Sequence, residues 1–125
     1  MRLGLDMVSV EDVQASIDEF GQRFVGRLFS LAEQADALAV PSRLAERLAA
    51  RFAAKEAAIK AFDLSEAGVS WRDLEVRCDG RGSCRLHLHG RAALVAGVQE
   101  AALSFSHRGG HAVAVVLAQD CRGAE

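Results

Sequence analysis

The fold of this chain is decided by the run RLAERLAARFAAKEAAIKAF, which spans residues 43–62. The run contains no glycine or proline, and eight alanines follow Leu44, a composition that favours helix. We expect one long helix that begins just after Pro41, with Ser42 as its N-cap, and ends at Phe62. The large apolar residues recur at the spacing of a stripe that faces the core: Leu44, Leu48, Phe52 and Ile59.

The residues that precede this helix begin with an alternating pattern. In residues 2–8, Leu3, Leu5 and Met7 lie on one side, and Gly4 and Asp6 lie on the other. This pattern predicts a strand with one buried face, with Asp6 on the face opposite the leucines. After it, Ser9 is expected to cap a short helix that reaches about residue 17, and residues 23–28 predict a second one.

The residues that follow the long helix have the character of paired strands. Residues 74–78 and 84–88 flank the hairpin sequence Asp79-Gly80-Arg81-Gly82. Residues 91–98 predict a short helix, and residues 101–107 and 112–117 form another strand pair. The chain is therefore expected to be α+β: a single domain over residues 1–120, with a mainly antiparallel sheet packed on one long helix. Residues 121–125 are expected to be a frayed tail.

Composition excludes several classes of function. The chain has 125 residues and a net charge of −2, so no basic field exists to hold nucleic acid or an anionic membrane surface. No run approaches the ~20 apolar residues that span a bilayer, and no signal-peptide pattern precedes Asp6. The three cysteines, Cys78, Cys84 and Cys121, leave at least one unpaired and argue against a disulfide framework. A cytoplasmic location is the resulting expectation.

Charged residues on the long helix form two rows. Glu56 and Lys60 are four residues apart and share one face, whereas Arg51 and Lys55 share another. Taken alone, such pairs are typical of a solvated surface, where each contributes a few tenths of a kcal/mol. Spacing by itself therefore does not identify a site.

A zinc site is one alternative, because thiolates and imidazoles are the usual zinc ligands. The candidates would be Cys78, Cys84, His87 and His89. The chain has no Cys-x-x-Cys motif, and the two histidines lie on a strand that leads out of a hairpin. This hypothesis is therefore disfavoured.

Three segments together resemble the holo-[acyl-carrier-protein] synthase family, the small trimeric members of the phosphopantetheinyl transferase superfamily. They are Gly4-Leu5-Asp6, residues 51–57 with Lys60, and Ser104-Phe105-Ser106-His107. The helix motif is the most specific of the three. Further matches are Arg23-Phe24 followed by Phe29-Ser30, residues 71–76 and residues 88–92.

The resemblance implies a fold and an activity. It implies the 4′-phosphopantetheinyl transferase fold and an Mg²⁺-dependent enzyme that transfers 4′-phosphopantetheine from coenzyme A to a serine of an apo acyl carrier protein. The transfer would release 3′,5′-ADP. The reaction would serve fatty acid or polyketide biosynthesis. It also implies a homotrimer whose active sites lie between neighbouring subunits.

The family pattern also implies roles for individual residues. Mg²⁺ prefers a few carboxylates together with phosphate oxygens and waters, which suits Asp6 and Glu56. Lys60, one turn beyond Glu56, would neutralise phosphate charge. By resemblance, Arg51, Lys60 and the pair Ser106 and His107 would bind coenzyme A, although His107 alone also fits a hydrogen-bonded turn histidine. The base that removes the serine proton could be Glu56, a water on the metal or the phosphate, and we predict Glu56.

The chain departs from the family pattern in three places. Ser9 stands where the family usually has a glutamate near the metal strand, and the hairpin lacks the usual Gly-Lys-Pro turn. The first helix, where relatives carry basic residues that grip the acyl carrier protein, instead holds acidic residues: Glu11, Asp12, Asp18 and Glu19.

The acidic first helix bears on the partner, because like charges repel an acidic carrier. We therefore expect a less acidic or specialised acceptor, contacted by Arg23 and Arg27. Arg43 and Arg47 are further candidates for this contact, and an ordinary exposed arginine is the alternative for each of the four. The departures also keep open a second function: a catalytically weak relative that binds coenzyme A or a carrier protein without efficient transfer.

Overall fold

The computed structural model describes residues 1–119 and confirms the α+β class. The predicted tail at residues 121–125 lies outside the described residues. The elements follow one another as β1 (Arg2–Ser9), α1 (Val10–Phe20), α2 (Gln22–Leu28), α3 (Leu31–Leu38), the 3₁₀ turn η1 (Pro41–Arg43), α4 (Leu44–Phe62), the 3₁₀ turn η2 (Trp71–Asp73), β2 (Leu74–Cys78), β3 (Cys84–Leu88), α5 (Gly90–Ala96), β4 (Glu100–Arg108) and β5 (His111–Ala118).

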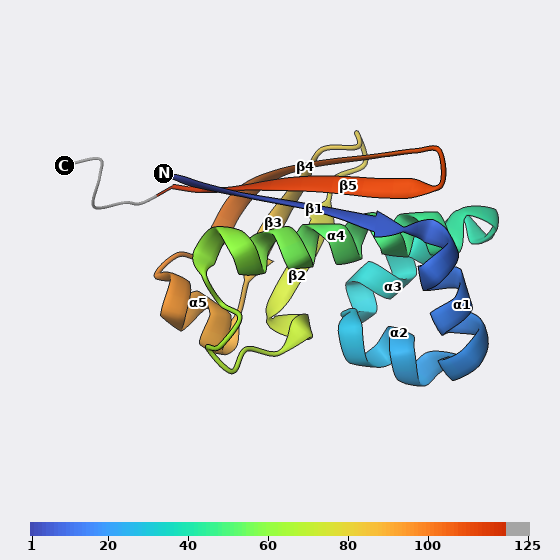
Figure 1. The fold of residues 1–125 in the computed structure, drawn as a ribbon, viewed down its shortest axis with the longest axis horizontal. Helices are drawn as coiled ribbons and strands as arrows, with labels where there is room; N and C mark the ends of the chain where they lie inside the picture. The colour runs from blue at the N-terminus through green and yellow to red at the C-terminus, as the bar shows by residue number, and fades with distance from the viewer. Residues whose placement is uncertain (120–125) are drawn as a thin grey trace.

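One antiparallel sheet forms the body of the molecule, with strand order β1-β5-β4-β3-β2. The long helix α4 runs along one face of this sheet, and α1, α2 and α3 gather beyond the end of β1 (Figure 1). The two edges of the sheet are therefore β1 and β2. Between residues 1 and 119, no helix has the length and apolar character that a membrane crossing requires.

The helix α4 packs unusually close to the sheet because the contact is made by small residues. A Cβ atom placed on Gly4 would lie 1.8 Å from the carbonyl oxygen of Ala57, so only glycine fits at this crossing. The side chains of α4 that bury completely along the sheet are alanines: Ala53, Ala54, Ala57, Ala58 and Ala61.

The predicted stripe on α4 faces the core. Leu48 is fully buried, and the partly buried members pack against the two hydrophobic clusters: Leu44, Phe52 and Ile59. The alanines are buried more completely than these larger residues, because methyl groups fill the space where the helix lies closest to the sheet. The long helix itself is confirmed to Phe62, although Arg43 and not Ser42 is its N-cap, because η1 occupies the turn before it.

The alternation predicted for β1 is confirmed, but its buried face is the one that carries Gly4. Leu3, Leu5 and Met7 are 69%, 62% and 61% exposed, and Gly4 is buried under α4. Asp6 lies opposite the leucines, as expected, on the side of the helix. The chain thus leaves a row of large apolar residues on the outer face of its sheet.

The helical segment before α4 contains one helix that the sequence pattern did not indicate. Ser9 caps α1 as predicted, and α1 extends to Phe20. The unpredicted helix is α3, which begins with a capping box between Ser30 and Glu33. Glu33 is fully buried: Oε1 accepts from Lys55 Nζ at 2.8 Å, and Oε2 accepts from the backbone N–H of Val76.

The hairpin of β2 and β3 is confirmed with the predicted bounds, and it contains a disulfide that the cysteine count did not anticipate. Cys78 and Cys84 are the last paired residues of the two strands, and their sulfur atoms are bonded. The count of three cysteines could not show this, because register and not number brings the two side chains together. The cytoplasmic location stays a prediction.

Candidate functional site

Two pockets bring the predicted site residues together, and the first lies between β1 and the middle of α4. We call it the carboxylate pocket, because Asp6 from β1 and Glu56 from α4 both line it. Its volume is about 380 Å³, and its lining consists of Asp6, Met7, Val8, Ser9, Asp12, Val13, Ser16, Phe24, Phe52 and Glu56.

The charges in the carboxylate pocket influence one another. Lys60 Nζ donates to Asp6 Oδ1 at 2.9 Å and to the carbonyl oxygen of Leu5 at 3.1 Å. Burial raises the pKa of Glu56, and the nearby Asp6 raises it further, against an opposing effect of Lys60. The bond to Asp6 is also the main reason why the pKa of Lys60 is raised.

The donor set of this pocket fits a magnesium ion. Asp6 and Glu56 offer two carboxylates to an open pocket, whose lining also includes Asp12, and Mg²⁺ takes a few carboxylates when substrate phosphates and waters complete its coordination. Between residues 1 and 119 there is no group of three or more histidine, cysteine, aspartate or glutamate side chains suited to a metal. The pocket is thus unlike a closed, all-protein metal cage.

Ser9 does not replace the missing carboxylate of the family pattern. Its Oγ accepts a hydrogen bond from the backbone N–H of Asp12 at 3.2 Å and so caps α1. The Ser9 side chain therefore caps the N-terminus of α1, although Ser9 also lines the pocket. A capping serine at this position orients α1 and adds no charge to the site.

The second pocket lies on the other flank of α4, beside the β2–β3 hairpin. We call it the arginine pocket. Its volume is about 430 Å³, and its lining consists of Asp36, Arg43, Glu46, Arg47, Ala50, Arg51, Cys78, Asp79, Gly80, Gly82, Cys84, Phe105 and His107.

Arg51 is the most buried charge of the arginine pocket, with only 3% of its surface exposed. Its Nη1 donates to the carbonyl oxygen of Arg47 and its Nη2 to Asp36 Oδ2, both at 3.1 Å. The buried Nε atoms of Arg47 and Arg51 have no hydrogen-bond partner in the described part of the chain. Such unpaired buried donors are costly.

His107 reaches the arginine pocket from β4, as the resemblance implied, but Ser106 does not. The Nδ1 atom of His107 lies 2.6 Å from Glu46 Oε1. Ser106 is exposed, and it is absent from the lining of the pocket because successive residues of a strand point to opposite faces. In this structure Ser106 is therefore not brought together with Arg51.

The two pockets are separated by the width of α4. Asp6 and Glu56 lie toward the β1 edge of the sheet, and Arg51 lies toward the β2 edge, where its Nη2 is 3.7 Å from Cys78 Sγ. The two pockets share no lining residue. A single chain therefore presents two half-sites on opposite flanks of one helix.

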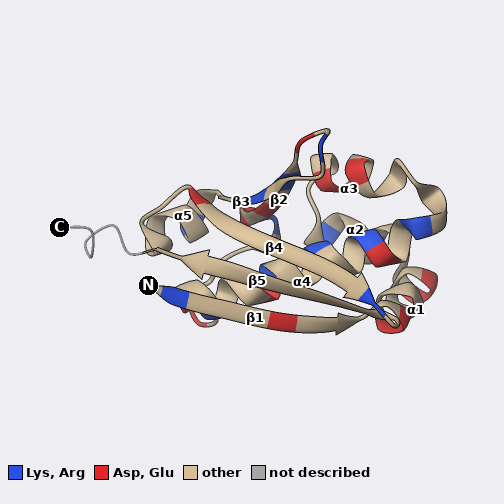
Figure 2. Cartoon of the chain, turned by 90° about the horizontal axis from the view of Figure 1, so that it is seen from above, with Lys and Arg blue, Asp and Glu red and all other residues tan. Residues whose placement is uncertain are grey.

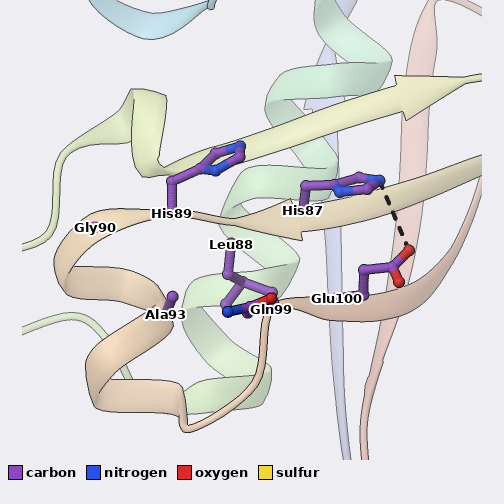
Figure 3. A pocket seen from close by; sticks show the side chains of 7 residues that line it. All are labelled: His87, Leu88, His89, Gly90, Ala93, Gln99 and Glu100. Carbon is purple, nitrogen blue, oxygen red and sulfur yellow. Dashed lines mark ion pairs between the residues drawn. The ribbon is translucent and has the colours of Figure 1, made fainter.

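The zinc alternative fails on geometry. His89 Nε2 lies 2.9 Å from Glu75 Oε1, and His87 Nε2 lies 3.7 Å from Glu100 Oε1. Both histidines line a third, open pocket at the start of α5, where His87 is directed toward Glu100 (Figure 3). The two cysteines are bonded to each other at the far end of β3, so the four side chains form no common site.

The arginines proposed for partner binding divide into two groups. Arg23 and Arg27 are exposed on α2, with the Arg23 guanidinium 5.9 Å from the ring centre of Phe20. Arg43 and Arg47 instead line the arginine pocket. Sequence reasoning did not indicate this role for Arg47, nor the parts played by Asp36 and Glu46, because their helical spacing is that of ordinary surface charges.

Comparison with known proteins agrees with this geometry. The family model of the 4′-phosphopantetheinyl transferase superfamily matches residues 2–116. The chain is 45% identical to the holo-[acyl-carrier-protein] synthase of Koribacter versatilis, over 94% of this chain and 96% of that protein.

Two solved structures extend the likeness to complexes. The ACPS–coenzyme A complex of Chronobacterium ammoniagenes is 30% identical with a TM-score of 0.78, over 95% of this chain and 98% of that one. The synthase of Bacillus anthracis in complex with coenzyme A (3′,5′-ADP) is 33% identical with a TM-score of 0.71, over 92% of each chain. The chain therefore belongs to the 4′-phosphopantetheinyl transferase superfamily and, within it, to the holo-[acyl-carrier-protein] synthase family.

Proposed function

We propose that the protein transfers 4′-phosphopantetheine from coenzyme A to a serine hydroxyl of an apo acyl carrier protein and releases 3′,5′-ADP. The observation that carries the proposal is the pairing of Asp6 and Glu56 in one open pocket of a chain that belongs to this family. The complexes of relatives with coenzyme A support the donor. The names of the curated relatives support the acceptor.

The charged residues Asp6, Glu56 and Lys60 each have a role in this proposal. Asp6 and Glu56 would hold Mg²⁺, which supplies charge neutralisation for the pyrophosphate when bound. Glu56 would take the proton of the attacking serine, directly or through water. Lys60 would move from Asp6 to a phosphate oxygen, a change that its long exposed side chain permits.

The arginine pocket would bind the adenosine-diphosphate end of the donor. Arg51 and His107 are the residues proposed for the 3′-phosphate, and the positive charges of Arg43 and Arg47, which line the same pocket, support an anionic ligand there. Ser106 stays a prediction, since it faces away from this pocket and would reach coenzyme A only on a neighbouring subunit.

A homotrimer would complete the site. The outer face of β1 carries exposed Leu3, Leu5 and Met7, and side chains other than lysine, arginine, aspartate and glutamate predominate along β1, β5 and β4 (Figure 2). An apolar sheet face of this kind favours burial against another copy. With the two half-sites on opposite flanks of α4, one subunit would contribute Asp6 and Glu56 and its neighbour part of the coenzyme A pocket.

The acceptor would be a less acidic or specialised carrier protein. The helix α1 carries acidic residues and no basic one, and Glu11 and Asp12 occupy its first turn (Figure 2). Arg23 and Arg27 lie four residues apart on the adjoining α2 and are the proposed carrier contacts. A salt titration of the transfer rate against several carriers tests this: a strong preference for the most acidic carrier that weakens steeply with salt would contradict it.

The direct test of the proposed function incubates the protein with Mg²⁺, coenzyme A and a panel of apo carriers. The mass of each carrier is read by mass spectrometry, and 3′,5′-ADP is measured by chromatography. We expect one added phosphopantetheine on at least one carrier, with an equal amount of 3′,5′-ADP. Coenzyme A binding without any carrier modification would favour the alternative of a binding protein.

A further inference from the structure

The arginine pocket holds an acidic residue in direct contact with its main anion-binding group. Asp36 Oδ2 lies 3.1 Å from Arg51 Nη2, and the Asp36 side chain is 41% exposed, whereas that of Arg51 is 3% exposed. The carboxylate thus sits at the mouth of the pocket and occupies one donor of the guanidinium that is proposed to bind the 3′-phosphate.

Asp36 does not use up the capacity of the pocket for an anion. The Nε atoms of Arg47 and Arg51 stay unpaired and buried among the described residues, and Arg43 adds a third guanidinium to the lining. A phosphate that enters would lie near the guanidiniums of Arg43, Arg47 and Arg51 and near the negative charge of Asp36, which lines the same pocket. Like charges in one partly buried site repel each other appreciably.

The position of Asp36 does not depend on its ion pair. Its helix α3 is fixed by the capping box of Ser30 and by Glu33, which bonds to Lys55 and to the backbone N–H of Val76. Arg51 keeps a separate hydrogen bond to the carbonyl oxygen of Arg47. The charge of Asp36 can therefore be removed without loss of the elements that form the pocket.

We propose that Asp36 is a specificity-determining residue whose carboxylate competes with the 3′-phosphate for Arg51 and so narrows the preference of the enzyme for coenzyme A over dephospho-coenzyme A. The inference rests on the proposed function, because coenzyme A is the ligand that brings a 3′-phosphate to the pocket. The two donors differ only in that phosphate, so a charge next to its site acts on one and not on the other.

The experiment compares the affinity of the full-length protein for both donors by isothermal titration calorimetry. Asp36→Asn keeps an oxygen that can accept from Arg51 but has no charge. Asp36→Glu keeps the charge. Glu66→Gln is the matched control, because it makes the same change in net charge at an exposed residue outside both pockets.

We expect Asp36→Asn to bind coenzyme A about threefold to tenfold more tightly than the wild type, with the affinity for dephospho-coenzyme A unchanged. Asp36→Glu and Glu66→Gln are expected to keep the wild-type ratio of the two affinities. Added salt should shrink the gain of Asp36→Asn, since the repulsion that it removes is electrostatic.

Two results would overturn the inference while the proposed function stands. One is weaker binding of coenzyme A by Asp36→Asn, which would make Asp36 a positioning residue for Arg51. The other is an equal change for both donors. A wild-type protein that binds neither donor would instead remove the proposed function, and the inference with it.

Discussion

At the scale of the residue, Lys60 forms its ion pair with Asp6 and not with Glu56, its neighbour on the helix. Glu56 and Lys60 have the i, i+4 spacing of an ordinary surface ion pair. In the structure Lys60 bonds to Asp6, 54 residues away in the chain, and leaves Glu56 directed to the same pocket as Asp6. Lys60 therefore pairs with a carboxylate of another element, which local spacing alone could not distinguish from a solvated row of charges.

The first prediction concerns Glu56. Glu56→Gln should lower the transfer rate by at least about a hundredfold, because the variant loses both a proposed metal ligand and the proposed base. The affinity for 3′,5′-ADP should change little, since the arginine pocket lies on the opposite flank of α4. Transfer is followed by carrier mass and binding by calorimetry. Transfer at the wild-type rate would remove Glu56 from the mechanism.

Glu75 provides a second residue-level case, in which hydrogen bonding outweighs burial. Burial by itself would raise the pKa of Glu75, but hydrogen bonds from Ser30, His89 and Arg77 hold it at about 2, below its ordinary value of 4.5. Lys55 adds a further positive charge nearby. The network connects the start of α3 to β2 and thereby supports the helix that carries Asp36.

The second prediction follows from the sign of this shift. Because the pKa of Glu75 is lower in the folded state, its ionised form stabilises the fold above about pH 4.5, and this contribution is lost as the pH falls toward 2. Glu75→Gln should reduce the free energy of unfolding at pH 7 by roughly 2 to 3 kcal/mol and flatten its decline between pH 4.5 and 2. Urea unfolding across this range measures both effects. The same acid-induced decline in wild type and variant would contradict the assignment.

At the scale of the element, the closeness of β1 and α4 determines where the carboxylates meet. Asp6 follows two residues after Gly4, and Glu56 precedes Ala57, so the tight crossing of Gly4 over Ala57 places the two acidic side chains at one pocket. Gly4 is thus required for the close packing of β1 on α4. This packing in turn brings Asp6 and Glu56 to the same pocket.

The third prediction tests this crossing. Gly4→Ala should lower the free energy of unfolding by about 3 kcal/mol or more, since the added Cβ would overlap the carbonyl oxygen of Ala57 and push the strand from the helix. Gly80→Ala is the matched control, because nothing lies within 4 Å of a Cβ at that hairpin position. Urea unfolding of both variants gives the comparison. Equal stabilities would show that the two elements can separate at little cost.

The elements differ in how far the sequence could predict them. The β2–β3 hairpin was predicted to the residue, because its turn chemistry is local. The helix α3 was missed, since Glu33 reads as a surface charge until Lys55 and Val76, both far along the chain, provide its partners. The sequence also could not predict which face of β1 is buried, because this depends on which side of the sheet α4 covers.

At the scale of the whole molecule, the proposed site residues of one chain lie in two separate pockets. Asp6, on the edge strand β1, shares one pocket with Glu56, whereas Arg51 shares the other pocket with His107 of the central strand β4. The family motifs predicted all four residues, but the sequence could not show that they divide into two pockets. In the proposed homotrimer, a neighbouring copy would supply the half-site of the other kind.

The last prediction follows from this arrangement. Leu5 is 62% exposed at the centre of the apolar row, so Leu5→Glu should leave the fold of the single chain intact but place a charge in the proposed subunit interface. Sedimentation should give three times the 13.4 kDa chain mass for the wild type and a single chain for the variant, which should also lose transfer activity. Leu94→Glu is the matched control, since Leu94 is 75% exposed on α5 and should keep both properties. A fully active monomer would show that one chain completes the site, and the separation of the two pockets would then need another explanation.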